Sequence, residues 1–285
     1  MDIKENESLE KYTTFRMGGT AKKMYFPETV EELQTVLSQH DRIERYIIGG
    51  GSNLLINDEV EFSNVLCMLN FQTKIKEMGE GTYYVGAGVR LQALIRKINE
   101  DGYGGIEYLY SVPGLIGGAV FMNAGRGRKY NCNISDYIEQ VDYMMDGQLC
   151  SAKREECDFS YRHSKFQDMQ YPVIVGVLFR FDKMEREESE RRRKERIDLC
   201  KANQDMSAPN FGTVFCMSNG KVMNLVKQWR LGKKSGIHFS GKTSNWLLNG
   251  PEGNYRQAKA LLKRVARMHK LVGKKCVAEV RMWDE

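Results

Sequence analysis

The chain has 285 residues, of which 41% are hydrophobic and 28% are charged, and its formal net charge is +6. These values are ordinary for a soluble globular protein of about two domains. The sequence holds no run of about 18 apolar residues, and its first six residues are polar and mixed in charge, unlike a secretion signal. We therefore expect a cytoplasmic protein that does not associate with membranes.

The seven cysteines are scattered, odd in number and never arranged as C-x-x-C. This spacing argues against a disulfide framework and against a zinc site, so most of the thiols are expected to be reduced packing residues. The four histidines do not form a metal-ligand spacing either. We therefore predict no metal ion.

Two segments carry much of the charge, residues 186–201 and 256–275. Acidic and basic residues are interspersed in the first, which is typical of a solvated helix face. Nucleic-acid binding is therefore not expected. A non-catalytic protein that uses these segments to bind a ligand or nucleic acid remains a minor alternative.

The N-terminal part of the chain predicts alternating strands and helices. A short strand is expected at 24–27, and a helix at 29–37 begins with Thr29 and has Glu32 three residues later, as in a capping box. Further elements follow in chain order: a strand at 45–48, glycine-separated strands over 65–89, and a helix at 91–100 ended by Asp101-Gly102.

The rest of the chain continues this α+β pattern. The expected elements are strands near 138–145 and 173–181, a linker helix within 182–203, helices near 221–228 and 255–271, and a last strand at 276–282. From these units we expect domain boundaries at 1–68, 69–207 and 208–285.

Two glycine-rich loops stand out, one at 49–55 and one at 112–125. Neither has the spacing of a dinucleotide fingerprint or a P-loop. Glycine lets the backbone approach a ligand closely, and backbone amides in such loops form anion-binding concavities suited to a pyrophosphate. Ser52 and Asn53 could add side-chain donors. The simpler alternative is that each loop is only a tight turn.

Several motifs occur in the order found in one enzyme family. They are Thr-Phe-Arg-Met-Gly-Gly-Thr-Ala at 14–21, Gly-Gly-Gly-Ser-Asn-Leu-Leu at 49–55, the long loop at 113–125, Phe-Ser-Tyr-Arg-His-Ser-Lys-Phe at 159–166, Gly-Thr-Val-Phe at 212–215 and Ala-Glu-Val-Arg at 278–281. In these segments the chain resembles the UDP-N-acetylenolpyruvoylglucosamine reductase family, in its shorter, type II-like form.

The resemblance implies an α+β protein with a two-part FAD-binding fold, of the kind found in vanillyl-alcohol oxidase, and a C-terminal α+β substrate-binding domain. FAD would be held noncovalently, because no histidine lies in the motif segments at 14–21, 49–55 or 112–125, and NADPH would supply the hydride. The implied partner is a UDP-linked amino sugar, and we expect a monomer or a weak dimer. The implied cofactor-binding residues are Gly49, Gly50, Gly51, Ser52, Asn53, Leu54, Pro113, Gly114, Gly117, Gly118, Asn123 and Gly125.

The same resemblance implies three catalytic residues. Arg162 matches an arginine whose guanidinium meets a carboxylate, and Glu279 matches a glutamate near the developing enolate. The simpler alternatives are an ion pair at a strand end for Arg162 and an exposed strand carboxylate for Glu279. Thr213 stands where the family has a proton-donating serine, and it keeps a hydroxyl but adds a methyl group.

Other positions depart from the family as well. Cys216-Met217-Ser218 replaces residues that help to hold the UDP moiety, and Thr243 replaces a common histidine. The basic loop 126–129 could supply replacement phosphate contacts. Cys216 could also be an alternative acid, although inert packing is the simpler interpretation. A related flavoprotein that acts on a different substrate is therefore the second hypothesis.

Overall fold

The computed structural model describes residues 1–39, 46–126 and 130–284. Residue 45 of the expected strand 45–48, and residues 127–129 of the basic loop, lie outside the described residues. The chain divides into two compact units. Unit 1 comprises Met1–Lys4, Met24–Gly50 and Asn64–Cys200, and unit 2 comprises Glu5–Lys23, Gly51–Ser63 and Lys201–Glu285. The three-domain boundaries expected from the sequence stay a prediction.

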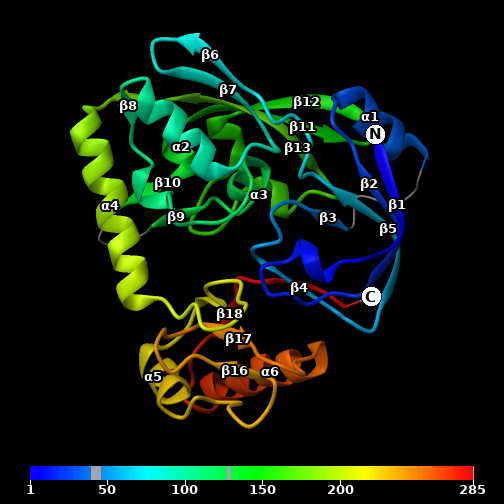
Figure 1. Cartoon of the computed structure of the whole chain (residues 1–285), viewed down its shortest axis with the longest axis vertical. Coiled ribbons are helices and arrows are strands. Elements are labelled where there is room, and N and C mark those ends of the chain that lie inside the picture. Colours follow the sequence, from blue (N-terminus) through cyan, green and yellow to red (C-terminus); the bar gives the residue numbers. More distant parts are fainter. Residues whose placement is uncertain (40–45, 127–129, 285) are drawn as a thin grey trace. The chain divides into compact units, whose positions relative to one another are not determined.

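A four-stranded sheet contains the N-terminal strands, in the order β1-β2-β5-β3 (Figure 1). Strand β3 lies parallel to β5, with Ile48 opposite Cys67. The helix expected after β2 is α1, and it buries Leu33, Val36 and Leu37. The strands and the helix are β1 (Asp2–Ser8), β2 (Thr20–Phe26), β3 (Ile47–Ile48), β5 (Glu61–Cys67) and α1 (Val30–Gln39).

The start of α1 agrees with the capping pattern in the sequence. The Thr29 hydroxyl accepts a hydrogen bond from the Glu32 amide at 3.3 Å. The Glu32 carboxylate accepts from the Glu28 amide at 2.8 Å, one residue before the position of an ideal capping box. Both bonds satisfy amides at the point where the helix begins.

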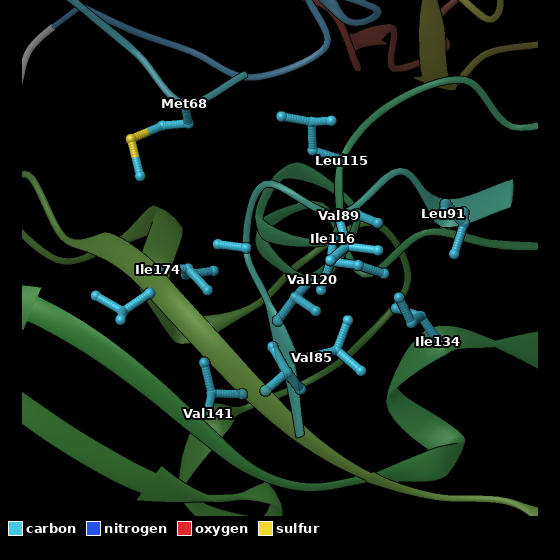
Figure 2. Close-up of a cluster of buried hydrophobic side chains, with 14 of the residues drawn as sticks. Met68, Val85, Val89, Leu91, Leu115, Ile116, Val120, Ile134, Val141 and Ile174 are labelled. Atoms are coloured by element: carbon cyan, nitrogen blue, oxygen red, sulfur yellow. The ribbon is translucent and has the colours of Figure 1, made fainter. Parts of the chain in front are cut away.

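Unit 1 is built around a five-stranded sheet in the order β12-β11-β13-β7-β6, whose neighbouring strands run antiparallel. Its central strand, β13, reads Val-Ile-Val-Gly-Val-Leu-Phe-Arg and is buried along most of its length. Figure 2 shows Val85, Val141 and Ile174 of this sheet grouped with Ile116 and Val120 of helix α3 (Ile116–Phe121). The strands are β6 (Ile75–Gly79), β7 (Thr82–Gly86), β11 (Ile138–Met145), β12 (Gln148–Lys153) and β13 (Val173–Arg180).

Shorter elements complete unit 1. Helix α2 buries one apolar face, and the long helix α4 is mostly exposed, although Ser189 and Arg196 are buried on it. The helices and short strands are α2 (Leu91–Glu100), α3 (Ile116–Phe121), α4 (Arg186–Asn203), β8 (Tyr103–Gly104), β9 (Gly125–Arg126), β10 (Cys132–Asn133) and β14 (Asp182–Lys183). Single 3-10 turns occur at Glu107–Leu109, Ile134–Tyr137, Arg154–Cys157 and Lys165–Gln167.

Unit 2 has its own apolar core, which includes Phe15 and Phe211 with ring centroids 4.6 Å apart. The strand expected at 276–282 is interrupted: β18 pairs antiparallel with β15, and β19 pairs parallel with β4. The elements are a 3-10 turn at Glu10–Tyr12, β4 (Leu54–Ile56), β15 (Phe215–Met217), α5 (Gly220–Gln228), β16 (Ile237–Phe239), β17 (Leu247–Asn249), α6 (Tyr255–Leu271), β18 (Val277–Ala278) and β19 (Arg281–Trp283).

The helices described at 1–39, 46–126 and 130–284 are each too short or too polar to cross a membrane. Within the same residues, no three histidine, cysteine, aspartate or glutamate side chains are grouped so that they could hold a metal ion.

Glu107 is a buried charge that organises the turn after α2. Its side chain is fully buried and accepts hydrogen bonds from the Asn99 amide at 2.8 Å and from the Gly105 backbone amide at 3.0 Å. The Arg192 guanidinium of α4 lies 3.9 Å from the second carboxylate oxygen. A buried carboxylate held in this way leaves several unsatisfied donors when it is removed.

We expect Glu107→Ala to lower the free energy of unfolding by roughly 3 kcal/mol, because the buried donors lose their acceptor. Urea unfolding followed by circular dichroism measures this change. The control is Glu100→Ala, since Glu100 is exposed at the end of the neighbouring helix. Equal midpoints for the two variants would show that Glu107 does not organise this turn.

Candidate active site

The first glycine loop contributes to both units, because the division of the chain falls between Gly50 and Gly51. Within unit 1, a Cβ atom added to Gly50 would lie 2.7 Å from the Cα atom of Gly114, in the second loop. This distance is far below ordinary carbon–carbon contact, so only glycine allows the two backbones to come so close. Within unit 1 the structure therefore brings Gly50 of the first loop against Gly114 of the second.

Gly51 has a different structural reason for being glycine. Its φ is +59°, and an added Cβ atom would lie 1.9 Å from the Tyr12 carbonyl oxygen. The Gly51 carbonyl accepts a hydrogen bond from the Thr14 amide at 3.0 Å. The motif at 14–21 therefore begins in direct contact with the glycine loop, within unit 2.

Two backbone amides of the second loop donate hydrogen bonds within the protein. The Ile116 amide donates to the Val89 carbonyl, and the Gly117 amide donates to the Ala87 carbonyl, both at 2.9 Å. These two N–H groups are therefore not available to a pyrophosphate. In contrast, a Cβ atom added to Gly118 would meet no atom within 4 Å. Gly118 is exposed and borders open space beside the loop.

Asn123 lies at the end of the second loop and is 4% exposed. Its backbone is in the left-handed region, with φ 42°, which asparagine tolerates better than most residues. The side-chain amide donates to the Ser160 carbonyl at 2.8 Å, while Oδ1 has no hydrogen-bond partner among the described residues. A buried amide oxygen of this kind fits a ligand that brings its own N–H donor.

Arg162 lies next to Asn123. The Arg162 guanidinium donates to the Asn123 carbonyl at 3.5 Å, and its centre lies 5.4 Å from the Tyr161 ring centroid. The backbone of Arg162 is also left-handed, with φ 58°. For a residue with a Cβ atom this conformation is uncommon and is found at functional sites more often than elsewhere.

Two polar residues that sequence analysis did not single out hold this turn in place. The Ser164 hydroxyl donates to the Phe121 carbonyl at 2.7 Å. The Gln167 side chain donates to the carbonyls of Phe121 and Arg162, at 2.9 and 3.0 Å. Ser164 belongs to the motif at 159–166, so the motif was the available signal. Gln167 directly follows this motif, and no sequence pattern indicated its role.

In unit 2 the structure brings together Thr213, Glu279 and Asn53. The Val214 carbonyl accepts from the Glu279 amide at 2.8 Å and from the Val280 amide at 3.5 Å. The Asn53 side chain donates to the Glu279 carbonyl at 3.0 Å. Thr213 precedes Val214 and is half-buried, as is Glu279. Two of the three predicted catalytic residues therefore lie on adjacent chain segments, beside the first glycine loop.

Asn245 fixes the segment that contains Thr213 and leads into β15, and sequence analysis did not assign it a role. Its Oδ1 accepts from the Phe215 amide at 3.1 Å, its Nδ2 donates to the Phe215 carbonyl at 2.8 Å, and its own carbonyl accepts from the Val214 amide at 3.0 Å. Its φ is 63°. Asn245 therefore positions the Thr213 segment through three hydrogen bonds.

Two of the residues that depart from the family, Thr243 and Cys216, form hydrogen bonds within unit 2. The Thr243 hydroxyl donates to the Asn203 carbonyl at 2.8 Å and accepts from the Asp205 amide at 2.7 Å, so Thr243 holds the segment that follows α4. The Cys216 thiol donates to the Val277 carbonyl at 3.5 Å, across the β15–β18 pair. Gly125 packs closely against Asn133, since an added Cβ atom would lie 2.2 Å from its Oδ1.

Burial keeps several thiols protonated. It raises the pKa of Cys67 and of Cys132 to about 12, and the pKa of Cys157 and of Cys276 to about 11. Thiols of this kind are poor nucleophiles at neutral pH. Cys67, Cys132 and Cys157 are buried and free of disulfides, which confirms the sequence-based prediction of packing cysteines for these three.

Comparison with known proteins identifies the class first. Residues 21–151 match the family model described as an FAD binding domain. The matched segment contains both glycine loops and the strands β6, β7 and β11 of the five-stranded sheet, and it ends within β12. The chain is therefore an FAD-binding protein, and the α+β fold class and the FAD cofactor predicted from the sequence are confirmed.

Relatives identify the family. The UDP-N-acetylenolpyruvoylglucosamine reductase of Chlamydia felis is 32% identical over 283 residues, covering 96% of this chain and 92% of the relative. That of Prochlorococcus marinus is 31% identical, covering 92% and 91%. The crystal structure of UDP-N-acetylenolpyruvylglucosamine reductase from Thermus caldophilus superposes with a TM-score of 0.78 at 25% identity, covering 99% of this chain and 98% of that one. This chain belongs to the UDP-N-acetylenolpyruvoylglucosamine reductase family.

Gly118 allows a test of where the cofactor lies. We expect Gly118→Ala to leave the flavin-free chain as stable as before, or up to about 1 kcal/mol more stable, because alanine favours the helix and its Cβ atom meets no protein atom. The same methyl group fills the open space beside the loop, so the FAD dissociation constant is expected to rise about tenfold or more. Fluorescence titration of the flavin-free chain measures it.

Gly220 provides the matched control. It begins α5, and a Cβ atom added to it also meets nothing within 4 Å. Gly220→Ala is expected to leave FAD binding unchanged. If Gly118→Ala binds FAD as tightly as Gly220→Ala does, the cofactor does not use the space at Gly118.

Proposed function

We propose that this chain is an NADPH-dependent flavoenzyme that reduces UDP-N-acetylenolpyruvoylglucosamine to UDP-N-acetylmuramate, in the synthesis of peptidoglycan precursors. Family membership supports the reaction, and one structural observation carries the assignment. The Val214 carbonyl binds the amide of Glu279, which places Thr213 and Glu279 on adjacent segments. A hydroxyl and a carboxylate on adjacent segments suit a reaction that ends in proton transfer. We place the reaction in the cytoplasm.

FAD would be held noncovalently by the residues of the two glycine loops. When bound, FAD would supply the redox chemistry, a hydride transfer from NADPH to the enolpyruvyl carbon of the substrate. The open space at Gly118 and the buried Oδ1 of Asn123 are the observations that fit the cofactor. The proposed cofactor-binding residues are Gly49, Gly50, Gly51, Ser52, Asn53, Leu54, Pro113, Gly114, Gly117, Gly118, Asn123 and Gly125.

Arg162 is proposed to bind the carboxylate of the substrate. Hydride addition to an enol ether that carries a carboxylate builds enolate charge, which a fixed cation stabilises. A guanidinium matches a carboxylate with two parallel hydrogen bonds. The left-handed backbone of Arg162 and its contact with the Asn123 carbonyl support a fixed position for this group.

Thr213 and Glu279 are proposed to complete the reaction at the neighbouring carbon. The Thr213 hydroxyl donates the proton that the enolate carbon needs, and Glu279 holds the enolate by a hydrogen bond when its carboxyl is protonated. The half-buried position of both residues limits the access of water. Asn245 keeps the Thr213 segment in place through its bonds to Phe215 and Val214.

A different substrate is the second candidate, and one observation favours it. Met217 and Val277 form a cross-strand pair on β15 and β18, and both side chains are exposed, at 51% and 44%. This apolar pair lies in the same two-stranded sheet as Phe215, close in sequence to Thr213 and Glu279. A substrate with an apolar group in place of part of the UDP moiety would suit it better.

The test of the proposed function follows the flavin absorbance. The purified chain is reduced anaerobically with NADPH, and UDP-N-acetylenolpyruvoylglucosamine is then added. Rapid return of oxidised flavin is expected, together with a product that has gained two hydrogen atoms by mass spectrometry. A chain that NADPH reduces but that stays reduced after addition of the sugar nucleotide supports the different substrate, and a chain purified without flavin contradicts both.

Arg162→Lys and Glu279→Gln are compared in the same assay. Each is expected to retain flavin and to slow reoxidation by substrate on the order of 10²-fold, because a fixed charge or hydrogen bond to the enolate is lost. The matched control is Arg180→Lys, since Arg180 is exposed and paired with Glu139. Reoxidation as fast as in the control would remove both assigned roles.

Two variants of Thr213 separate the role of its hydroxyl group from the role of its β-branched shape. Thr213→Ser keeps the hydroxyl and removes the methyl group, so turnover is expected to hold or rise. Thr213→Val keeps the β-branched shape and removes the proton donor, so the proton-transfer step is expected to slow about 10²-fold or more. Single-turnover kinetics with the solvent isotope effect measures this step. Equal rates for the two variants would exclude Thr213 as the donor.

A further inference from the structure

Four arginines of unit 1 converge on two consecutive residues, Tyr110 and Ser111. The Arg196 guanidinium donates to the Ser111 hydroxyl oxygen at 2.5 Å, and the Arg126 guanidinium donates to the same oxygen at 3.3 Å. Arg193 lies over the Tyr110 ring, 5.7 Å from its centroid, and Arg96 donates to the Tyr110 hydroxyl at 3.3 Å. The cluster joins α2, α4 and β9 around the start of the second glycine loop.

Arg196 is the buried member of this cluster. It is 7% exposed, and its Nη2 atom has no hydrogen-bond partner in the described part of the chain. No ion pair joins Arg196 to another described residue. The neighbouring arginines on α4 are satisfied differently, because Arg191 and Arg192 both bind the Glu188 carboxylate, at 2.7 and 2.6 Å.

A buried guanidinium without a carboxylate is unusual in proteins. Removing its charge from water is costly, and buried charges are ordinarily paired or fully hydrogen-bonded. The Ser111 hydroxyl is neutral, so it does not balance the charge of Arg196, and it also accepts a hydrogen bond from Arg126. Because its oxygen already accepts from two arginines, its own proton can be donated elsewhere. The unsatisfied Nη2 donor and the positive charge of Arg196 therefore both indicate a binding site for an anion.

The place of the cluster in the chain indicates the class of anion. Ser111 directly precedes the second glycine loop, and Arg126 directly follows Gly125 at its end. Guanidinium groups bind phosphate with parallel N–H donors, and a hydroxyl adds a further hydrogen bond. We propose that Arg196, Arg126 and Ser111 form a phosphate site that takes a phosphate group of a dinucleotide. The assignment of the phosphate to a dinucleotide rests on the proposed function. That function involves two dinucleotides, so the phosphate group is either the pyrophosphate of FAD or the 2′-phosphate of NADPH.

Inorganic pyrophosphate is the probe, because its binding does not depend on turnover. Calorimetric titration of the flavin-free chain is expected to show binding, and Arg196→Met is expected to raise the dissociation constant about tenfold or more, since charge-assisted hydrogen bonds are lost. Replacing a buried unpaired cation with an apolar side chain of similar length should not unfold the chain. The matched control is Arg186→Met, because Arg186 is exposed on the same helix and paired with Glu190.

Two further arms identify the source of the phosphate. If the site holds the FAD pyrophosphate, the flavin-loaded chain no longer binds inorganic pyrophosphate, and Arg196→Met weakens FAD binding. If it holds the NADPH 2′-phosphate, the flavin-loaded chain still binds pyrophosphate, and Arg196→Met raises the KM for NADPH in flavin reduction without changing that for NADH. Either pattern supports the site, whatever the enolpyruvyl substrate proves to be.

Ser111→Ala serves as the second variant, in case Arg196→Met does not fold. It removes the shared hydroxyl and keeps both cations, so weaker pyrophosphate binding than in the Arg186→Met control is expected. Pyrophosphate affinity equal to that of the control in every folded variant would overturn the phosphate site. If pyrophosphate binding does not depend on these residues but the substrate still reoxidises the flavin normally, the phosphate site is excluded and the proposed function is retained.

Discussion

The close approach of Gly50 and Gly114 is the constraint on which the proposed cofactor-binding loops depend. The two backbones lie so near that a single added Cβ atom would come within 2.7 Å of the opposite Cα atom. This contact ties the first loop to the second, and the second loop in turn leads into α3 and to Asn123. Hydrogen bonds from Ile116 and Gly117 to carbonyls in the turn after β7 then hold the second loop beside the sheet. The glycines thus act first on backbone packing, and through packing they shape the space in which a ligand can bind.

The Val214 carbonyl plays the corresponding part in unit 2. It accepts two amides in succession, from Glu279 and Val280, and this double acceptance interrupts the C-terminal strand at the residue that carries the carboxylate. A regular strand would point Glu279 according to simple alternation. The interruption instead sets Glu279 by its contacts with Val214 and Asn53. A local irregularity in a sheet is a common way to aim a functional side chain.

Sequence analysis predicted those parts of the fold that local patterns determine. Helix α1 was predicted from Thr29 and Glu32, and α6 was predicted near 255–271, because the patterns that favour a helix act over a few residues. The break in the final strand was not predicted, because it depends on a carbonyl far away in the sequence. Asn245 was missed for the same reason, since its hydrogen bonds go to a strand thirty residues earlier. The roles of Arg162, Thr213 and Glu279 came from motif resemblance, and they stay predictions.

Arg196 shows the limit of charge patterns as a guide to function. In the sequence it lies within a run of alternating glutamate and arginine, which is typical of a solvated helix face. Most of α4 follows that interpretation, and Arg191 and Arg192 form the expected pairs with Glu188. Arg196 lies four residues after Arg192, one helical turn on, yet it is buried and hydrogen-bonded to Ser111. The pattern does not distinguish these arginines, because their difference arises from what packs against the helix. A cation that the fold buries without a carboxylate indicates a ligand more strongly than any of the exposed charges around it.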